Sequence, residues 1–244
     1  MKARLVAHRG DCAHYPENSL PALASALKSG VNHLEFDVQL TADRVPVLLH
    51  DVDLTRTTGQ PGNVTQMQWD AVKNLQTAEP ERFGTRFRHV LLPSLADAVE
   101  FLNRSPGAIV FVEIKPESVA AFGVQPTVDA VLAALKPARF PWNIIGLDPA
   151  VVEYARKRGP RPVGWVLSTV DEGAQAIADT LRPDYLFCDH RQLPKTLWIG
   201  PWRWVAYATS DPATARALFA RGIALVETDD PQDLGEALEP RPGT

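Results

Sequence analysis

Short apolar runs alternate with amphipathic helical patterns along the chain, and this alternation constrains the fold more than any other feature of the sequence. The runs are four to eight residues long, are bounded by turn residues and are often rich in Val, Ile or aromatic residues, which is typical of buried strands. The expected strands are residues 4–7, 33–40, 109–114, 142–147, 163–167, 185–188, 202–208 and 223–227. The expected helices are residues 18–28, 94–103, 127–135, 149–157, 171–181, 212–220 and 231–238. Eight strands with intervening helices predict an α/β fold, a TIM (β/α)₈ barrel, with a doubly wound sheet as the alternative. The sequence has no GxGxxG or P-loop motif that would support a nucleotide-binding version of that sheet.

Helix starts are marked by residues that cap a first turn. Asn18 precedes one expected helix, and Ser94 stands three residues before Asp97 at the start of another. Asp211 comes directly before Pro212, the pattern of an N-cap followed by a first-turn proline. These signals predict where the helices begin.

One connection, residues 51–93, is oversized, and a loop of this length inside a compact domain is usually functional. It contains a helical pattern over residues 65–75, in which Thr65 and Gln68 have the spacing of a capping box. The sequence therefore predicts a single domain over residues 1–244 with a small inserted segment after the second strand, at about 51–93.

Composition excludes several classes of protein. The 25 basic and 29 acidic residues leave a formal charge of −4, which is spread along the chain and gives no footprint for nucleic acid. No run of eighteen apolar residues occurs, so we expect no stable membrane insertion. Two cysteines make no disulfide framework, and Leu5-Val6-Ala7 is too short for the apolar core of a signal peptide. We therefore expect a cytoplasmic protein.

Polar residues gather at the carboxyl ends of the expected strands, which in a barrel surround the active site. Strand alternation places the two acidic residues of the second strand on one face. The set consists of His8 and Arg9 after the first strand, Glu35 and Asp37 in the second, His50 after a short extension of it, and Glu113 and Lys115 at the end of the third.

The three carboxylates Glu35, Asp37 and Glu113 would repel one another at one barrel mouth unless some are protonated or a cation neutralises them. Oxygen ligands favour a hard divalent ion, Mg²⁺ or Ca²⁺, over zinc. Each residue taken singly also has a structural interpretation, since Glu113 and Lys115 could form a solvated edge pair. The Glu35–Asp37 pair on an apolar strand is harder to dismiss, because buried carboxylates need partners.

The basic residues of the set suit a phosphate ester. Arg9 and Lys115 would hold phosphoryl oxygens and stabilise the charge that develops during transfer. His8 and His50 would supply a general base and a general acid near neutral pH. A lone histidine beside a strand end, or an arginine that caps a carboxylate, is commonly structural, and the set is specific only as a whole. It predicts metal-assisted cleavage of a small-molecule phosphodiester.

The chain also resembles the glycerophosphodiester phosphodiesterase family from about Val6 to Pro231. The order and spacing of the N-terminal motifs carry the resemblance. The matching motifs are His8-Arg9-Gly10, Pro16-Glu17-Asn18-Ser19, Glu35-x-Asp37, Thr41-x-Asp43, His50-Asp51, Leu54-x-Arg56-Thr57-Thr58, Pro93-Ser94-Leu95, Glu113-Ile114-Lys115 and Thr228-Asp229-Asp230-Pro231.

The resemblance implies a TIM barrel that hydrolyses glycerophosphodiesters to sn-glycerol 3-phosphate and an alcohol with one divalent cation, Mg²⁺ or Ca²⁺. It does not fix which histidine is the acid and which the base, and we favour His50 as the group that protonates the leaving alcohol. Glu17 and Asn18 are expected to order the first loop and cap its helix. The implied roles are acid/base catalysis for His8 and His50, metal binding for Glu35, Asp37 and Glu113, and phosphoryl binding for Arg9 and Lys115.

The C-terminal half departs from the family pattern on the substrate side of the cavity. Gly146-Leu147 stands where the family commonly shows Ser-Phe, and residues 207–210 read Tyr-Ala-Thr-Ser instead of Trp-Thr-Val-Asn. We therefore expect an altered glycerol or alcohol pocket, with Tyr207 as its aromatic wall or as a core residue with a satisfied hydroxyl. Trp202 and Trp204 are expected to be structural.

Two alternative functions are consistent with the same residues: one has the same chemistry on a different substrate, and the other binds phosphate without catalysis. A lysophospholipase D would need an apolar channel through the inserted segment. Val64, Met67, Trp69 and Val72 would line that channel, unless they simply pack one face of a small helix on the barrel. The second alternative is a catalytically silent phosphate-binding barrel, although the sequence retains both histidines and all three carboxylates.

Overall fold

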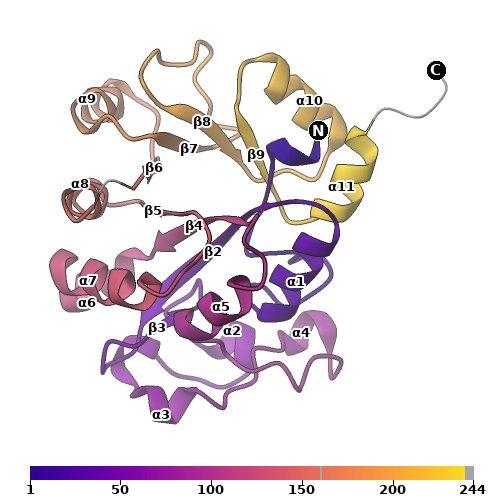
Figure 1. Cartoon of the computed structure of the whole chain (residues 1–244), viewed down its shortest axis with the longest axis vertical. Helices are drawn as coiled ribbons and strands as arrows, with labels where there is room; N and C mark the ends of the chain where they lie inside the picture. The colour runs from indigo at the N-terminus through magenta and orange to yellow at the C-terminus, as the bar shows by residue number, and fades with distance from the viewer. Residues whose placement is uncertain (160, 240–244) are drawn as a thin grey trace.

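Parallel strands close into a barrel in the computed structural model, which describes residues 1–159 and 161–239 (Figure 1). The remaining residues of the expected domain, 160 and 240–244, lie outside the described residues. The eight barrel strands within the described ranges are β1 (Leu5–Ala7), β2 (His33–Leu40), β4 (Ile109–Ile114), β5 (Trp142–Gly146), β6 (Val163–Val166), β7 (Tyr185–Asp189), β8 (Arg203–Tyr207) and β9 (Leu225–Thr228). They follow one another around the ring in this order, and β1 pairs in parallel with both β2 and β9. Because the ring closes, the predicted TIM barrel is confirmed and the doubly wound alternative is wrong.

Helices surround the barrel, because each buries one apolar face against the strands (Figure 1). In α8, for example, Val151, Val152 and Ala155 are buried while Glu153 on the opposite face is exposed. The main helices are α1 (Leu20–Lys28), α5 (Leu95–Leu102), α6 (Pro116–Phe122), α7 (Val124–Leu135), α8 (Pro149–Lys157), α9 (Glu172–Leu181), α10 (Pro212–Ala220) and α11 (Pro231–Leu238). Within the described ranges no single helix combines the length and apolar character needed to cross a bilayer, although α6 and α7, bent by 117°, pass that test as a pair by length and composition alone.

The predicted helix starts are largely confirmed. Ser94 and Asp97 form a reciprocal capping box at α5, and the Asp211 carboxylate accepts a hydrogen bond from the backbone N–H of Thr214 at α10. The prediction that Asn18 caps the first helix is wrong, because Ser19 caps α1. Asn18 has a left-handed backbone with φ of 55°, and its side chain bonds to Asp37 instead.

The inserted segment forms a small body of its own beside the barrel, at the bottom of Figure 1. The short strand β3 (Pro46–Leu48), which pairs antiparallel with β2, leads into this segment. The side chains Leu54, Val64 and Val72 of the segment are buried in a separate apolar cluster with Leu92. Its elements are α2 (Thr55–Thr58), a 3₁₀ turn (Val64–Gln66), α3 (Trp69–Val72) and α4 (Pro80–Phe83).

The predicted helix over residues 65–75 is wrong, as is its capping box. The chain is pinned here by bonds to the β2–β3 turn: the Met67 carbonyl accepts from the Ala42 N–H, and the Trp69 N–H donates to the Asp43 carboxylate at 2.9 Å. These long-range bonds replace bonds of a continuous helix, so only two short turns form. Asn63 caps the first of them.

The inside of the barrel is apolar below its mouth. Alternating residues of the strands point inward, and the interior cluster consists of Val6, Phe111, Ile145, Val166, Phe187, Val205 and Leu225. In β2, Glu35 is paired in register with the inward-facing Phe111 of β4. β2 therefore contributes a carboxyl group to the interior, where the other strands contribute the apolar side chains of this cluster. Two residues further along β1, β2, β4 and β7, at their carboxyl ends, the inward positions become polar, with His8, Asp37, Glu113 and Asp189.

Candidate active site

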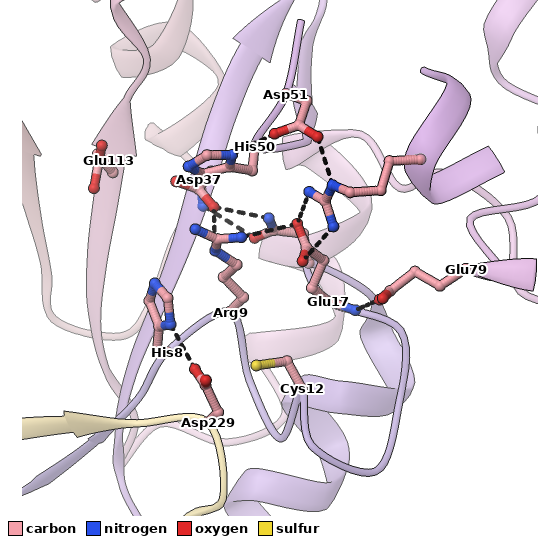
Figure 2. A network of polar contacts seen from close by, with 12 residues as sticks. His8, Arg9, Cys12, Glu17, Asp37, His50, Asp51, Glu79, Glu113 and Asp229 are labelled. Atoms are coloured by element: carbon pink, nitrogen blue, oxygen red, sulfur yellow. Dashed lines mark hydrogen bonds and ion pairs between the residues drawn. The ribbon is translucent and has the colours of Figure 1, made fainter. Parts of the chain in front are cut away.

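Predicted site residues gather at the carboxyl ends of β1, β2 and β4, and Figure 2 shows His8, Arg9, Asp37, His50 and Glu113 there. Val6 and Phe111 face the interior, so His8 and Glu113, two residues further on, face the mouth above them. Asp37 is paired in register with Glu113 across β2 and β4. His50 enters from the end of β3, at the start of the inserted segment. The barrel thus collects side chains that are far apart in the sequence.

Three carboxylates lie close enough to share one ion. One oxygen each of Glu35, Asp37 and Glu113 lies within 4.8 Å of the others. Glu35 is buried, and its Oε2 accepts from the backbone N–H of Arg9 at 2.9 Å, whereas its Oε1 has no hydrogen-bond partner among the described residues. Burial and the neighbouring Asp37 raise the pKa of Glu35 well above its usual range. A buried carboxylate oxygen without a partner, beside two further carboxylates, fits a hard cation.

The two predicted phosphate-binding residues form ion pairs with these carboxylates. Arg9 places Nε 3.1 Å from Asp37 and Nη1 3.1 Å from Glu17, and Lys115 places Nζ 2.8 Å from Glu113 and 3.3 Å from Asp37. Although burial opposes ionisation, Lys115 and Arg9 hold the pKa of Asp37 well below its usual range. The mouth therefore holds fixed positive charge beside its negative charge.

Each histidine is oriented by a carboxylate. Nδ1 of His8 lies 2.7 Å from Asp229, and Nδ1 of His50 lies 2.6 Å from Asp51. Burial lowers the pKa of His8, but the hydrogen bond to Asp229 and the charge of Glu227 outweigh it and raise the pKa overall. Bonding through Nδ1 leaves Nε2 of both rings available to a molecule in the mouth. These two carboxylate partners were missed in the sequence interpretation, although Asp51 and Asp229 both lie in the quoted motifs.

A network of arginine and glutamate side chains ties the inserted segment to the mouth (Figure 2). Arg56, in α2, donates to Asp51 through Nε at 2.5 Å and to both oxygens of Glu17 at 2.7 and 2.9 Å. Glu17 also accepts from Arg9. His50 is therefore held indirectly by Arg56, through Asp51. Sequence reasoning assigned Glu17 to the first loop but did not predict this link.

Glu227 is a further buried carboxyl group that sequence reasoning missed. It lies on β9, in register with Val6, and it is 3% exposed. Its Oε1 has no hydrogen-bond partner within the described part of the chain, and burial raises the pKa of this group to about 8. The sequence did contain a signal for Glu227, because this residue ends the last expected strand, 223–227. Collecting polar residues at strand ends, as was done for the first three strands, would have selected it.

Tyr207 lies on β8, in register with Asp189 of β7. Its ring packs against the interior cluster, and its hydroxyl donates to the Leu167 carbonyl at 3.4 Å. The residue is half-buried at the mouth, and its role as a pocket wall remains a prediction. Trp202 and Trp204 are buried in the outer core, consistent with the structural role expected for them.

The fold and this mouth together define a TIM-barrel protein with three clustered carboxylates and two cationic side chains at the carboxyl ends of its strands. The chain belongs to the glycerophosphoryl diester phosphodiesterase family, whose model matches residues 8–193. The resemblance read from the sequence motifs is therefore confirmed.

Individual relatives match parts of the chain. The glycerophosphodiester phosphodiesterase of Caldanaerobacter subterraneus subsp. tengcongensis is 32% identical over 145 residues, which cover 59% of this chain and 57% of that one. Human glycerophosphodiester phosphodiesterase 1 is 34% identical over 111 residues, 45% of this chain and 33% of that one. These alignments span between a third and three fifths of the relatives' length.

Solved structures match the fold over almost its whole length. A phosphodiesterase of Oleispira antarctica, solved in complex with the product sn-glycerol-3-phosphate, has a TM-score of 0.85 at 24% identity, covering 96% of both chains. A glycerophosphodiester phosphodiesterase of Agrobacterium tumefaciens has a TM-score of 0.77 at 21% identity, covering 96% of this chain and 99% of that one. At these identities the likeness shows the fold.

Proposed function

We propose that the chain hydrolyses a glycerophosphodiester to sn-glycerol 3-phosphate and an alcohol. The observation that carries this proposal is the convergence of three carboxylates on a mouth that two carboxylate-bound histidines flank. Family membership supports the reaction class, and the Oleispira relative binds the product that this reaction would give.

The proposal assigns one divalent cation to Glu35, Asp37 and Glu113. Oε1 of Glu35 has no hydrogen-bond partner in the described ranges, and this, with the raised pKa of that carboxyl group, supports a cation at this place. When bound, Mg²⁺ or Ca²⁺ supplies the positive charge that keeps these carboxylates ionised and polarises the phosphoryl group.

Arg9 and Lys115 bind the phosphoryl oxygens in this proposal. Lys115 has three N–H donors, so its ammonium group can keep its bonds to Glu113 and Asp37 and still donate to a phosphate. The Arg9 guanidinium is fixed by Glu17 and Asp37, so it does not need to be ordered when substrate binds. Both residues thus present positive charge where negative charge develops.

The two histidines divide the proton transfers between them. His8 takes the proton of the attacking water, because the hydrogen bond to Asp229 makes its imidazole a stronger base. His50 protonates the leaving alcohol, and Asp51 stabilises the charged imidazolium that this role requires. In each case Nε2 faces the substrate while the carboxylate holds Nδ1.

The test is an assay of purified protein with glycerophosphocholine and with a lysophospholipid, with and without Mg²⁺ or Ca²⁺. Metal-dependent release of sn-glycerol 3-phosphate is the expected result. Release of lysophosphatidic acid instead would favour a lysophospholipase D, and tight binding of phosphate esters without turnover of either substrate would favour a silent module.

Packing accounts for the four apolar residues that an acyl channel would use. Val64 and Val72 are buried in the apolar cluster of the inserted segment, and Met67 and Trp69 pack against it. The other interpretation, in which they pack one face of a small helix on the barrel, is wrong about the helix, because only short turns form, but it agrees with their role in packing.

A further inference from the structure

A second set of potential metal ligands lies beside His8. One ring nitrogen of His8, Sγ of Cys12 and a carboxylate oxygen of Asp229 are all within 4.8 Å of one another, and Figure 2 shows the three side chains grouped below Arg9. Nδ1 is the ring nitrogen that faces Asp229, at 2.7 Å. Cys12 is buried, whereas the Asp229 side chain is 52% exposed, so an ion can reach the group from solvent. The set is distinct from the all-carboxylate site.

The backbone fixes these three residues in place. His8 and Asp229 leave the adjacent strands β1 and β9, and the His8 N–H donates to the Thr228 carbonyl at 3.0 Å. Gly10 then turns the chain back with φ of +81°, where a Cβ would lie 2.7 Å from the Ala22 backbone, so only glycine fits. The Ala13 N–H donates to the Asp229 carbonyl at 2.9 Å, which holds Cys12 against Asp229.

The chemistry of the donors selects the ion. An imidazole nitrogen, a sulfur atom and a carboxylate oxygen suit a borderline-soft ion that prefers four ligands, and they do not suit Mg²⁺ or Ca²⁺. Ligand atoms around a tetrahedral zinc ion at about 2.0–2.3 Å stand roughly 3.3–3.8 Å apart. The three ligand atoms reach that spacing if the His8–Asp229 contact of 2.7 Å opens and any distance between the roughly 3.8 Å of this range and the observed limit of 4.8 Å closes. The neighbouring Arg9 charge is compensated by Glu17 and Asp37.

We propose that His8, Cys12 and Asp229 form a Zn²⁺ site that switches the enzyme off. On binding, the Cys12 thiol releases its proton to solvent and the thiolate, the neutral His8 ring and Asp229 each supply one ligand atom, with a water in the fourth position. A ring that ligates through Nδ1 carries its proton on Nε2, so His8 can no longer accept a proton there. The inhibitory consequence rests on the proposed function, whereas the metal site itself does not.

The primary experiment measures ligation without relying on activity. Co²⁺, which replaces Zn²⁺ in such sites, is titrated into the protein in the presence of excess Mg²⁺ while the near-ultraviolet thiolate-to-cobalt charge-transfer band is recorded. We expect the band in the wild type and in C188S, which removes the other cysteine, and its loss in C12S. A C12S protein with the same band and cobalt affinity as the wild type would overturn the site.

Cobalt bound at another group of potential ligands would not produce this band. Asp11, His14 and Asp230 form another group with ligand atoms within 4.8 Å, but it contains no sulfur and gives no thiolate band. If the wild type shows the band but hydrolyses no phosphodiester, the site stands and the proposed function fails.

The inhibition is then measured on the active enzyme. At saturating Mg²⁺ we expect Zn²⁺ to inhibit the wild type and C188S equally, and C12S to need at least about tenfold more Zn²⁺ for the same inhibition, since removing one of three protein ligands weakens binding at least that much. Equal sensitivity of C12S and the wild type would show that Zn²⁺ acts at the carboxylate site and would refute the switch.

Discussion

Replacing Asp51 with Asn tests how His50 is held and what it does. Asp51 stands between the Arg56 Nε–H, at 2.5 Å, and Nδ1 of His50, at 2.6 Å. An asparagine at this position must turn its carbonyl oxygen to Arg56, because that group only donates. Its NH₂ group then faces Nδ1 of His50 and donates to it, so the ring proton moves to Nε2. The substitution keeps the shape of the side chain but reverses the hydrogen bond and removes the charge that stabilises the imidazolium.

The expected loss follows from the interaction that disappears. A hydrogen bond to a charged group contributes about 1.5–3 kcal/mol. At about 1.4 kcal/mol for each factor of ten in rate, D51N should lower kcat for glycerophosphocholine by roughly 10- to 150-fold. KM should change little, because Asp51 is expected to act on the charged transition state and not on bound substrate.

A substrate whose leaving group needs no proton distinguishes loss of general-acid catalysis by His50 from a nonspecific loss of activity in D51N. The p-nitrophenyl ester of glycerol 3-phosphate releases a stable phenolate, so D51N should lose far less activity towards it. The exposed Asp70, which pairs with Lys73 on the inserted segment, provides the matched control D70N, for which both rates should be unchanged. If D51N lost both activities equally, or kept kcat for glycerophosphocholine within about twofold, the assignment of His50 as the general acid would be wrong.

Three further predictions concern the cation, the buried carboxyl group and the fold. E35Q should weaken Mg²⁺ or Ca²⁺ binding in titration calorimetry, because it removes one of three charged ligands, and unchanged affinity would place the ion elsewhere. In metal-free protein Glu227 holds its proton up to pH about 8, whereas in the unfolded chain it loses it near 4.5, so the free energy of unfolding should fall as pH rises between these values. E227Q should flatten that slope in urea denaturation series at pH 5 and pH 8, and parallel slopes for both proteins would contradict this. S94A removes the acceptor of the Asp97 N–H at α5 and should cost about 1 kcal/mol, or roughly 2–4 °C in Tm by calorimetry, and an unchanged Tm would show that this cap does not contribute.

The inserted segment takes part in the architecture of the proposed site. Arg56 lies in α2 of this segment and bonds to Asp51 and Glu17. Glu17 in turn bonds to Arg9, which pairs with Asp37 in the barrel. A change in the insertion that displaced Arg56 would therefore reach both a histidine and the carboxylates. This explains physically why a long connection follows directly after His50-Asp51.

Most barrel elements could be predicted because their pattern is local. Burial on both faces makes residues 109–112 of β4 a continuous apolar run, and Ser94 and Asp211 mark helix starts by their own side chains. The prediction failed where distant contacts override the local pattern. Met67 and Trp69 bond to the β2–β3 turn, which breaks the helix expected at 65–75, and Asn18 bonds to Asp37 instead of capping α1.

For the proposed site, too, some features could be predicted from the amino-acid sequence and others depended on the tertiary structure. The amino-acid order alone determined the residue types, since His8, Glu35, Asp37, His50 and Glu113 stand at strand ends where a barrel directs side chains into its mouth. Only the tertiary structure decided which partners these side chains take: Asp229 for His8, Arg56 behind Asp51, Cys12 beside Asp229 and, among the described residues, none for Oε1 of the buried Glu227. The physical reason is that periodicity fixes the direction of a side chain within its own strand. Distances of three ångströms between residues two hundred positions apart depend on how the ring closes.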